Sequence, residues 1–216
     1  MDIRHKFIQA KSALSVQGEQ ASCDSSSGRI PPGQNQVENF PVLDLGTHPD
    51  ISPQTWTLRL FGLVDRELDL SWSDFQALPQ KNQLADFHCV THWTQLDMEW
   101  QGVSAASVIA LAHARPEARF LTLHGYDDYT VNLPVAALLD DDVILAHSVF
   151  GRALSREHGG PVRLVVPKRY GWKSVKWLKA IEFHATDRPG FWESRGYHNE
   201  GDPWREERFS GMPNDE

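Results

Sequence analysis

The chain has 216 residues, of which 40% are hydrophobic and 23% are charged, and a chain of this size can bury one sizeable core. Its 21 Lys and Arg residues against 29 Asp and Glu residues give a formal net charge of -8, so the overall field repels DNA, RNA and anionic lipid. These values exclude nucleic acid as an expected partner and favour one domain.

Residues 1–36 carry Ser, Gln and Gly with little periodicity, which predicts a flexible N-terminal tail ahead of a domain of residues 37–216. Charged and polar residues interrupt the apolar ones throughout Met1 to Ala21, so no secretory signal is expected. No apolar run approaches the roughly 20 residues that a membrane-spanning helix needs. We therefore expect a cytoplasmic protein with no membrane insertion.

The first predicted elements follow the tail. Thr55 to Phe61 alternates polar and large apolar residues, which predicts a strand with one face on a core, and Glu67 to Leu70 predicts its neighbour. Ser71 and Asp74 have the spacing of a capping box, so a short helix is expected from Trp72 to Leu78.

A second helix is expected from Ser104 to Ala114, where apolar residues share one helical face. Further short strands are expected at 81–90, 119–123, 129–133, 143–146, 162–166 and 178–184. Many short strands with few helices predict an α+β fold dominated by β structure. The aromatic-rich segment 188–209 is expected to wrap onto this domain, because aromatic residues at such density usually pack.

Cys89 is the first candidate for chemistry. It lies at the end of a predicted strand in the segment Phe87-His88-Cys89-Val90-Thr91-His92-Trp93, where a thiolate could bind a soft metal. A small buried hydrophobe is the plainer interpretation of a lone cysteine. His88 and His92 could favour a thiolate, although neighbouring strand residues face opposite ways, which weakens a Cys-His zinc site. Cys23 lies in an unlike context, so both thiols are expected to be reduced.

The second candidate is a basic stretch. Residues 161–180 hold six cations and no acidic residue, inside a chain that is acidic elsewhere. Such a stretch favours an anion, and Gly171 lets the backbone turn closely so that the following N–H groups could face a phosphate. A solvated basic face is the alternative. Aromatic residues in the stretch also resemble a single-strand nucleic-acid surface, which the net acidity disfavours.

Other motifs are absent or weak. The sequence contains no HExxH, GxSxG, P-loop, GxGxxG or CxxC pattern, which removes the common hydrolase, NTPase, dinucleotide and zinc-ribbon hypotheses. The histidines at 113, 124, 147 and 184 are interpreted as structural. The three carboxylates at 140–142 are interpreted as an exposed turn and not a cation site.

Three segments together resemble the molybdopterin-binding domain of sulfite oxidase-like oxidoreductases: 87–93, His158 to Pro167, and Tyr170 to Trp177. The resemblance spans roughly Pro32 to Phe209 and is strongest to the small stand-alone members. It is more distant to the catalytic subunit of periplasmic methionine sulfoxide reductase. It implies the mixed, β-rich sulfite oxidase fold and a molybdenum held by one pterin dithiolene and one cysteine, which would be Cys89.

The same resemblance implies the other residues of the cofactor site. Arg163 matches an arginine that contacts the pterin phosphate region, and Ser174, Val175 and Lys176 match the loop that holds the same anion. His158 stands at a polar pterin contact, with His88 beside the metal ligand. Three positions with looser matches complete the implied set, namely Asn39, Phe40 and Gly125.

Departures from the family pattern bear on the substrate and partners. Sulfite oxidases place an arginine shortly after the metal-binding cysteine, and Thr91 to Gln95 contains none, which puts sulfite itself in doubt. Close relatives often have an arginine where His92 stands. The chain shows no haem-binding pattern and no immunoglobulin-like dimerisation domain, so we expect a separate electron-transfer protein and a monomer.

The resemblance implies two-electron oxygen-atom or proton-coupled redox chemistry on a small-molecule substrate, with molybdenum and molybdopterin as cofactors. Two alternatives stay open. One is a non-catalytic carrier or assembly protein that holds the pterin, and the other is a hydrolase that uses Cys89 with a nearby histidine and needs no metal.

Overall fold

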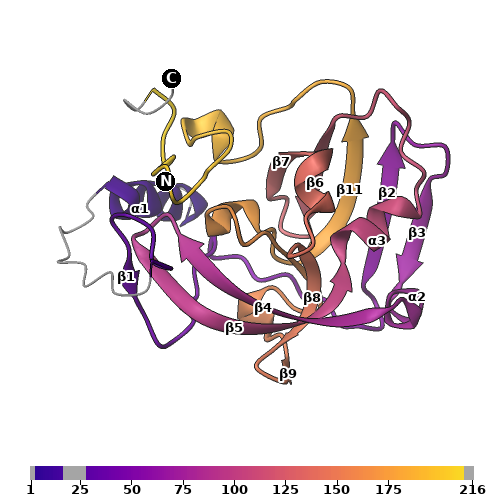
Figure 1. Ribbon diagram of the computed structural model, residues 1–216, viewed down its shortest axis with the longest axis horizontal. Coiled ribbons are helices and arrows are strands. Elements are labelled where there is room, and N and C mark those ends of the chain that lie inside the picture. Colours follow the sequence, from indigo (N-terminus) through magenta and orange to yellow (C-terminus); the bar gives the residue numbers. More distant parts are fainter. Residues whose placement is uncertain (1–2, 17–27, 212–216) are drawn as a thin grey trace.

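Two mixed β-sheets carry most of the chain, with a few short helices between their strands (Figure 1). The computed structural model describes residues 3–16 and 28–211. This architecture confirms the predicted α+β, β-rich fold class. None of the helices in the described ranges is long and apolar enough to cross a membrane.

The five-stranded sheet has the order β3-β2-β11-β6-β7. β2 and β11 are parallel while the other pairs are antiparallel. Its strands are β2 (Thr57–Gly62), β3 (Leu68–Ser71), β6 (Phe120–Gly125), β7 (Thr130–Pro134) and β11 (Leu178–His184).

The six-stranded sheet is organised around the long hairpin of β4 and β5. β5 also pairs with β8 and, in parallel, with β1, while β8 carries β10 and β9. Its strands are β1 (Asn35–Gln36), β4 (Gln80–Cys89), β5 (Trp93–Ser104), β8 (Ile144–Val149), β9 (Arg152–Ala153) and β10 (Arg163–Val165).

The helices are short, apart from the first. They are α1 (Ile3–Val16), α2 (Trp72–Ala77) and α3 (Ala105–Ala110), with 3-10 turns η1 (Val135–Leu139), η2 (Arg156–His158), η3 (Gly171–Lys173) and η4 (Glu193–Arg195). The capping box that the sequence predicts is present, because the Ser71 hydroxyl accepts from the Asp74 N–H and the Asp74 carboxylate accepts from the Ser71 N–H. α3 ends earlier than expected, at a tightened last turn.

Two hydrophobic clusters form the interior. The main core lies around Trp56, Leu60 and Phe75 between the sheets and α2 and α3. A second group, here called the aromatic cluster, surrounds the end of β4 and includes Phe87, Cys89, Trp93, Trp100, Tyr170, Trp172, Trp192 and Tyr197. The aromatic C-terminal segment therefore packs onto the domain as expected, and it does so beside Cys89.

The structure adds two features that the sequence did not indicate. Parts of the predicted flexible tail 1–36 have regular structure, since α1 is a helix and Asn35–Gln36 pairs with β5, and Gln34 is buried. Cys23 and the serine run at 25–27 lie outside the described residues. β5 was not predicted at all, although Met98, Trp100 and Gly102 alternate with exposed residues along it.

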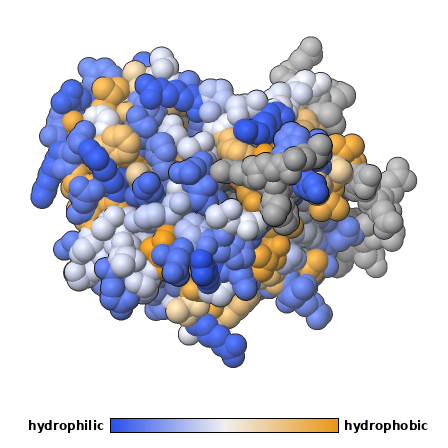
Figure 2. Space-filling view, turned by 180° about the vertical axis from the view of Figure 1, so that it is seen from behind, coloured by the Kyte–Doolittle hydropathy of each residue, from blue (hydrophilic) through white to orange (hydrophobic). Residues whose placement is uncertain are grey.

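Seen from behind, the face is mainly hydrophilic, and hydrophobic residues lie in several groups on it, some beside the end where α1 lies and others at the opposite edge (Figure 2). Leu14 and Val16 on α1 are among the exposed apolar side chains. The interior that matters for chemistry, the aromatic cluster, is at the same end as α1 (Figure 1).

Gly102 in β5 is predicted to be intolerant of a side chain. A Cβ there would lie 2.0 Å from the Leu145 carbonyl oxygen of β8. Gly102→Ala should therefore lower the free energy of unfolding by about 3 kcal/mol, measured by urea denaturation. Gln101→Ala, at an exposed position of the same strand, is the control and should change it by less than about 0.5 kcal/mol. Equal stability of the two variants would contradict the close β5–β8 approach.

Candidate cofactor and active site

Cys89 is the last residue of β4, and the chain turns back into β5 directly after it. Its side chain is 8% exposed and reaches a cavity, not the main core. The nearest polar partner of its Sγ is the Thr91 hydroxyl, at 3.1 Å. The end of a strand therefore holds the thiol rigidly while leaving it open to a ligand.

The cavity opens to solvent, and the space free of protein atoms within it and at its mouth is about 810 Å³. Seven parts of the chain line it: α1, residues 40–45, residues 87–93 at the β4–β5 turn, residues 127–129, Arg163, residues 171–177 and the aromatic C-terminal segment. Five of the residues predicted from sequence line it together, namely Cys89, Phe40, Arg163, Ser174 and Lys176. The cysteine and the two cations, far apart in sequence, thus share one cavity as predicted.

Arg163 is a buried cation without a carboxylate partner among the described residues. It is 2% exposed, and its guanidinium lies 5.3–5.6 Å from the ring centroids of Phe40, Phe87 and Trp100. It donates to the carbonyl oxygens of His158 (3.0 Å) and Ser174 (3.2 Å). Burial lowers the pKa of Arg163 to about 9, so it is still charged at neutral pH. A desolvated charge of this kind is stabilised by an anion in the cavity.

The loop 174–176 adds further donors. The backbone N–H groups of Val175 and Lys176 have no acceptor within residues 3–16 and 28–211. Lys176 Nζ lies 3.5 Å from the Asp44 carboxylate, and it donates to the Glu157 carbonyl oxygen at 2.6 Å. Successive free N–H groups beside two cations form a site suited to phosphate. The expected backbone role of this loop is therefore compatible with its geometry.

Trp93 supplies an orphaned donor. Its indole is 9% exposed and lines the cavity, and its Nε1 has no hydrogen-bond partner in the described part of the chain. Buried polar groups are nearly always paired in folded proteins. An unpaired N–H on a ring that lines a cavity fits a bound ligand with acceptor atoms, and a pterin that carries ring nitrogens, thiolates and a phosphate offers several.

One predicted residue, His158, supports the cavity without lining it. The His158 ring stacks on Phe40 with centroids 4.5 Å apart, and its Nε2 donates to the Phe40 carbonyl oxygen at 2.9 Å. Asn39, the predicted residue directly before Phe40, is exposed to solvent. His158 therefore holds Phe40 and, through its own carbonyl, Arg163.

The structure places three other predicted residues away from the cavity. His88 lies on the opposite face of β4, where its Nδ1 is 2.9 Å from the Thr94 hydroxyl, because neighbouring strand residues alternate. Gly125 lines a separate surface groove beside β11. The Val175 side chain is buried in the main core, so only its backbone can face an anion.

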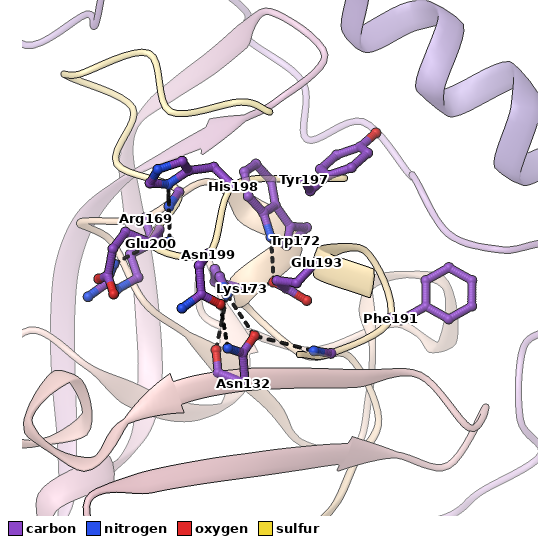
Figure 3. Close-up of polar contacts among 12 residues, drawn as sticks. Asn132, Arg169, Trp172, Lys173, Phe191, Glu193, Tyr197, His198, Asn199 and Glu200 are labelled. Carbon is purple, nitrogen blue, oxygen red and sulfur yellow. Dashed lines mark hydrogen bonds and ion pairs between the residues drawn. The ribbon is translucent and has the colours of Figure 1, made fainter. Parts of the chain in front are cut away.

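The basic stretch does not act as one surface. Lys173 is fully buried and pairs with Glu193 at 2.6 Å, and it also donates to the Asn132 carbonyl oxygen at 3.0 Å (Figure 3). Lys168 pairs with Asp140, and Arg169 pairs with Glu200. Of the six cations in 161–180, the cavity is lined only by Arg163 and Lys176.

Several lining residues were missed by reasoning from sequence. Trp93 lies in the segment 87–93, but no role was predicted for it. No sequence motif around Asp44 indicated that it would line a cavity. Aromatic density predicted packing for Trp192 and Tyr197 but not their place in the cavity wall. Lys11 fell in the segment that was expected to be a flexible tail.

The geometry disfavours two of the alternatives for Cys89. Within the described ranges no group of three or more His, Cys, Asp or Glu residues is arranged to hold a metal ion, so a metal here must arrive with other ligands. His92 Nδ1 faces the Gly33 carbonyl oxygen at 2.8 Å, and His88 is on the far face of the strand. Neither histidine is positioned as the base of a cysteine hydrolase.

Comparison with known proteins now decides the family. Residues 45–192 match the family model for the oxidoreductase molybdopterin binding domain. The chain belongs to this family. Its cofactor is accordingly molybdopterin with molybdenum, as the sequence predicted, and the cavity described above has the donors that such a group requires.

Members of the molybdopterin-binding oxidoreductase family resemble the chain to different extents. An uncharacterized oxidoreductase of Bacillus subtilis, YuiH, is 44% identical over 85% of this chain and 93% of its own length. The protein-methionine-sulfoxide reductase catalytic subunit MsrP of Campylobacter jejuni is 30% identical over 67% of this chain and 54% of its own. The chain thus spans about half of that relative.

A solved structure shares the fold. The sulfane dehydrogenase SoxCD of Paracoccus pantotrophus is 28% identical, with a TM-score of 0.60 over 65% of this chain and 41% of that chain. The β-rich, mixed-sheet fold expected from the resemblance is therefore confirmed.

Replacing Arg163 separates cofactor binding from stability. Arg163→Met removes a desolvated cation but also three hydrogen bonds to carbonyl groups, so the two effects oppose each other. We expect the free energy of unfolding of cofactor-free protein to change by less than about 2 kcal/mol, while molybdenum and phosphorus in the purified protein fall at least roughly tenfold. Arg152→Met, at an exposed position in β9, should leave both unchanged. Full retention of phosphorus in Arg163→Met would contradict the anion site.

Lys176 predicts a pH dependence of cofactor binding. Burial, and then repulsion from Arg163, lower the pKa of Lys176 to about 8, so its proton is lost as the pH rises through that value. Affinity of the cofactor-free protein for molybdopterin should fall roughly tenfold from pH 7 to pH 9 for this lysine alone. The measurement is quenching of tryptophan fluorescence. Lys176→Arg, which stays protonated, should have a shallower profile, and identical profiles would contradict the assignment.

Proposed function

We propose that this protein is a molybdenum oxidoreductase of the sulfite oxidase type, with Cys89 as the protein ligand of the metal. The observation that carries the proposal is that the Cys89 thiol, Arg163 and Lys176 line one cavity. A soft thiol at one position and a phosphate site at another match the two ends of a metal-bearing phosphorylated pterin. The bound group supplies two-electron oxygen-atom or proton-coupled redox chemistry to a small substrate.

The residues of the chain bind and orient this group. Arg163, Lys176 and the free N–H groups of 175–176 hold the phosphate, while Trp93 Nε1 donates to an acceptor of the pterin. Phe40, stacked against His158, closes one side, and the aromatic cluster excludes water from the rest. A dry, fixed set of donors strengthens each electrostatic contact in the site.

The thiol must lose its proton when it ligates a metal. Burial raises the pKa of Cys89. The hydrogen bonds of Thr91 and the positive charges of Lys11 and Arg208 lower this pKa, but the effect of burial is larger. Cys89 is thus a thiol in the cofactor-free protein, and its inertness there agrees with a role as a ligand and not as a nucleophile.

The substrate and partners belong to the same proposal. Relatives named for protein-methionine-sulfoxide reduction and for sulfane dehydrogenation support a sulfur-containing group as the substrate. Two relatives are described as subunits, which supports electron exchange with a separate protein. A cytoplasmic location stays a prediction, to be tested by fractionation of cells that produce the protein.

Elemental analysis tests the proposal most directly. Protein purified from cells that make the cofactor should contain one molybdenum and one or more phosphorus atoms per chain. Turnover with artificial electron acceptors then separates an enzyme from a carrier or assembly protein, which would hold the pterin without turnover. Purified protein with neither element would overturn the proposal.

Cys89→Ser is predicted to abolish turnover, because a neutral hydroxyl replaces the thiolate ligand. The molybdenum absorption spectrum should change while phosphorus content falls by less than roughly threefold, since Arg163 and the 174–176 loop still hold the phosphate. Thr91→Val, which removes the hydroxyl beside Sγ, is the matched control and should keep the spectrum. An active Cys89→Ser enzyme would exclude Cys89 as the ligand.

A further inference from the structure

The N-terminal helix α1 is attached to the wall of the cavity. Ser15 is 2% exposed, its hydroxyl lies 3.0 Å from the Tyr197 hydroxyl, and its carbonyl oxygen accepts from His92 Nε2 at 3.0 Å. About two turns earlier in the helix, Ile8 packs against the aromatic cluster. The helix is therefore held by an apolar contact and by two hydrogen bonds to elements distant in sequence.

One face of α1 makes these contacts. Ile8, Lys11 and Ser15 are spaced so that they share a side of the helix, and all three are at least partly buried. Lys6 and Gln9 face away and are exposed. Lys11 and Ser15 both line the cavity that contains Cys89, so α1 forms one wall of the site.

Lys11 is a cation in this wall whose side chain has no ion-pair or hydrogen-bond partner among the described residues. Burial lowers the pKa of Lys11 to about 8, and the charges that act against this are Asp44, Cys89 and Asp127. Asp44 is already engaged by His48 at 2.7 Å and by Lys176 at 3.5 Å. A partly desolvated ammonium with no partner is stabilised when an anion enters the cavity.

The position of α1 in the chain makes this feature additional to the family site. Lys11 lies outside residues 45–192, which match the family model. The segment from Thr91 to Gln95, directly after Cys89, contains no Arg or Lys. Positive charge near the thiol therefore comes from another element, and α1 brings one such charge to it.

We propose that α1 completes the cavity and that Lys11 binds an anionic group there, either an anionic substrate at Cys89 or the phosphate of the cofactor. The inference rests on the proposed function, because the cofactor phosphate and an anionic substrate are the ligands that a cofactor-dependent enzyme would have at this site. Its structural basis is the shared lining of the cavity by Lys11 and Cys89 and the docking of α1 through Ser15 and Tyr197.

The experiment compares Lys11→Gln with Lys6→Gln, which removes the same charge from the exposed side of the same helix. Molybdenum and phosphorus contents are measured first, in full-length protein. Sulfate is then titrated into the molybdenum-loaded protein by calorimetry. A loss of one charge-assisted contact should raise the sulfate Kd at least roughly tenfold in Lys11→Gln, and Lys11→Arg should restore it.

The two sources of the anion give different results. Normal metal and phosphorus contents with weaker sulfate binding assign Lys11 to a substrate anion, and reduced contents assign it to the cofactor phosphate. Unchanged contents and unchanged sulfate binding in Lys11→Gln would overturn the proposal, as would equal effects of Lys6→Gln. Rapid hydrogen exchange throughout α1 in the wild-type protein would also overturn it, because the helix would then not be docked.

Failure of the proposed function is distinguishable from failure of this inference. A wild-type protein that contains no molybdenum refutes the proposed function. Sulfate titration of that metal-free protein still tests Lys11, because the cavity and α1 are present without the metal. A sulfate Kd that is the same in wild type and Lys11→Gln then removes the role of Lys11 as well.

Discussion

The buried guanidinium of Arg163 is the constraint around which the site is arranged. It joins two segments by donating to the carbonyl oxygens of His158 and Ser174, within a box of aromatic rings. No carboxylate in the described ranges balances its charge, and a bare cation in an apolar interior is costly. The fold therefore holds a charge that no carboxylate of the described residues neutralises, which is a property expected of an anion-binding site and not of a structural ion pair.

Lys173 shows the contrasting solution ten residues later. It is as deeply buried as Arg163, but it pairs with Glu193 and donates to Asn132 (Figure 3). Its charge is neutralised within the protein, so it ties the 3-10 turn η3 to the C-terminal segment. Two cations from one basic stretch thus differ in their partners: Arg163 lines the cavity without a carboxylate partner among the described residues, and Lys173 is paired and fastens the wall of the same cavity.

The position of Cys89 connects the anion site to the chemistry. The thiol stands where β4 ends and the chain reverses, so the backbone is rigid on one side and the side chain meets open space on the other. The chain belongs to the same family as relatives that differ from it in length. The helix α1, which forms one wall of the cavity, lies outside residues 45–192, which match the family model. Variation between such relatives is therefore expected at the walls of the site and not at the thiol.

The sequence alone determined the features that depend on near neighbours. Short apolar patterns between turn residues located most strands, and the Ser71–Asp74 spacing located α2. The three motifs identified the family and the cofactor, and they contain Cys89, Arg163 and Lys176, which line one cavity. Tertiary structure alone decided how charges are partnered. Glu193, Asp140 and Glu200, which pair with three of the six cations of the basic stretch, come from other parts of the chain. The docking of α1 likewise depends on Tyr197, 182 residues from Ser15. Local patterns in a sequence carry no information on such long-range contacts, because they arise only when the sheets and the C-terminal segment pack together.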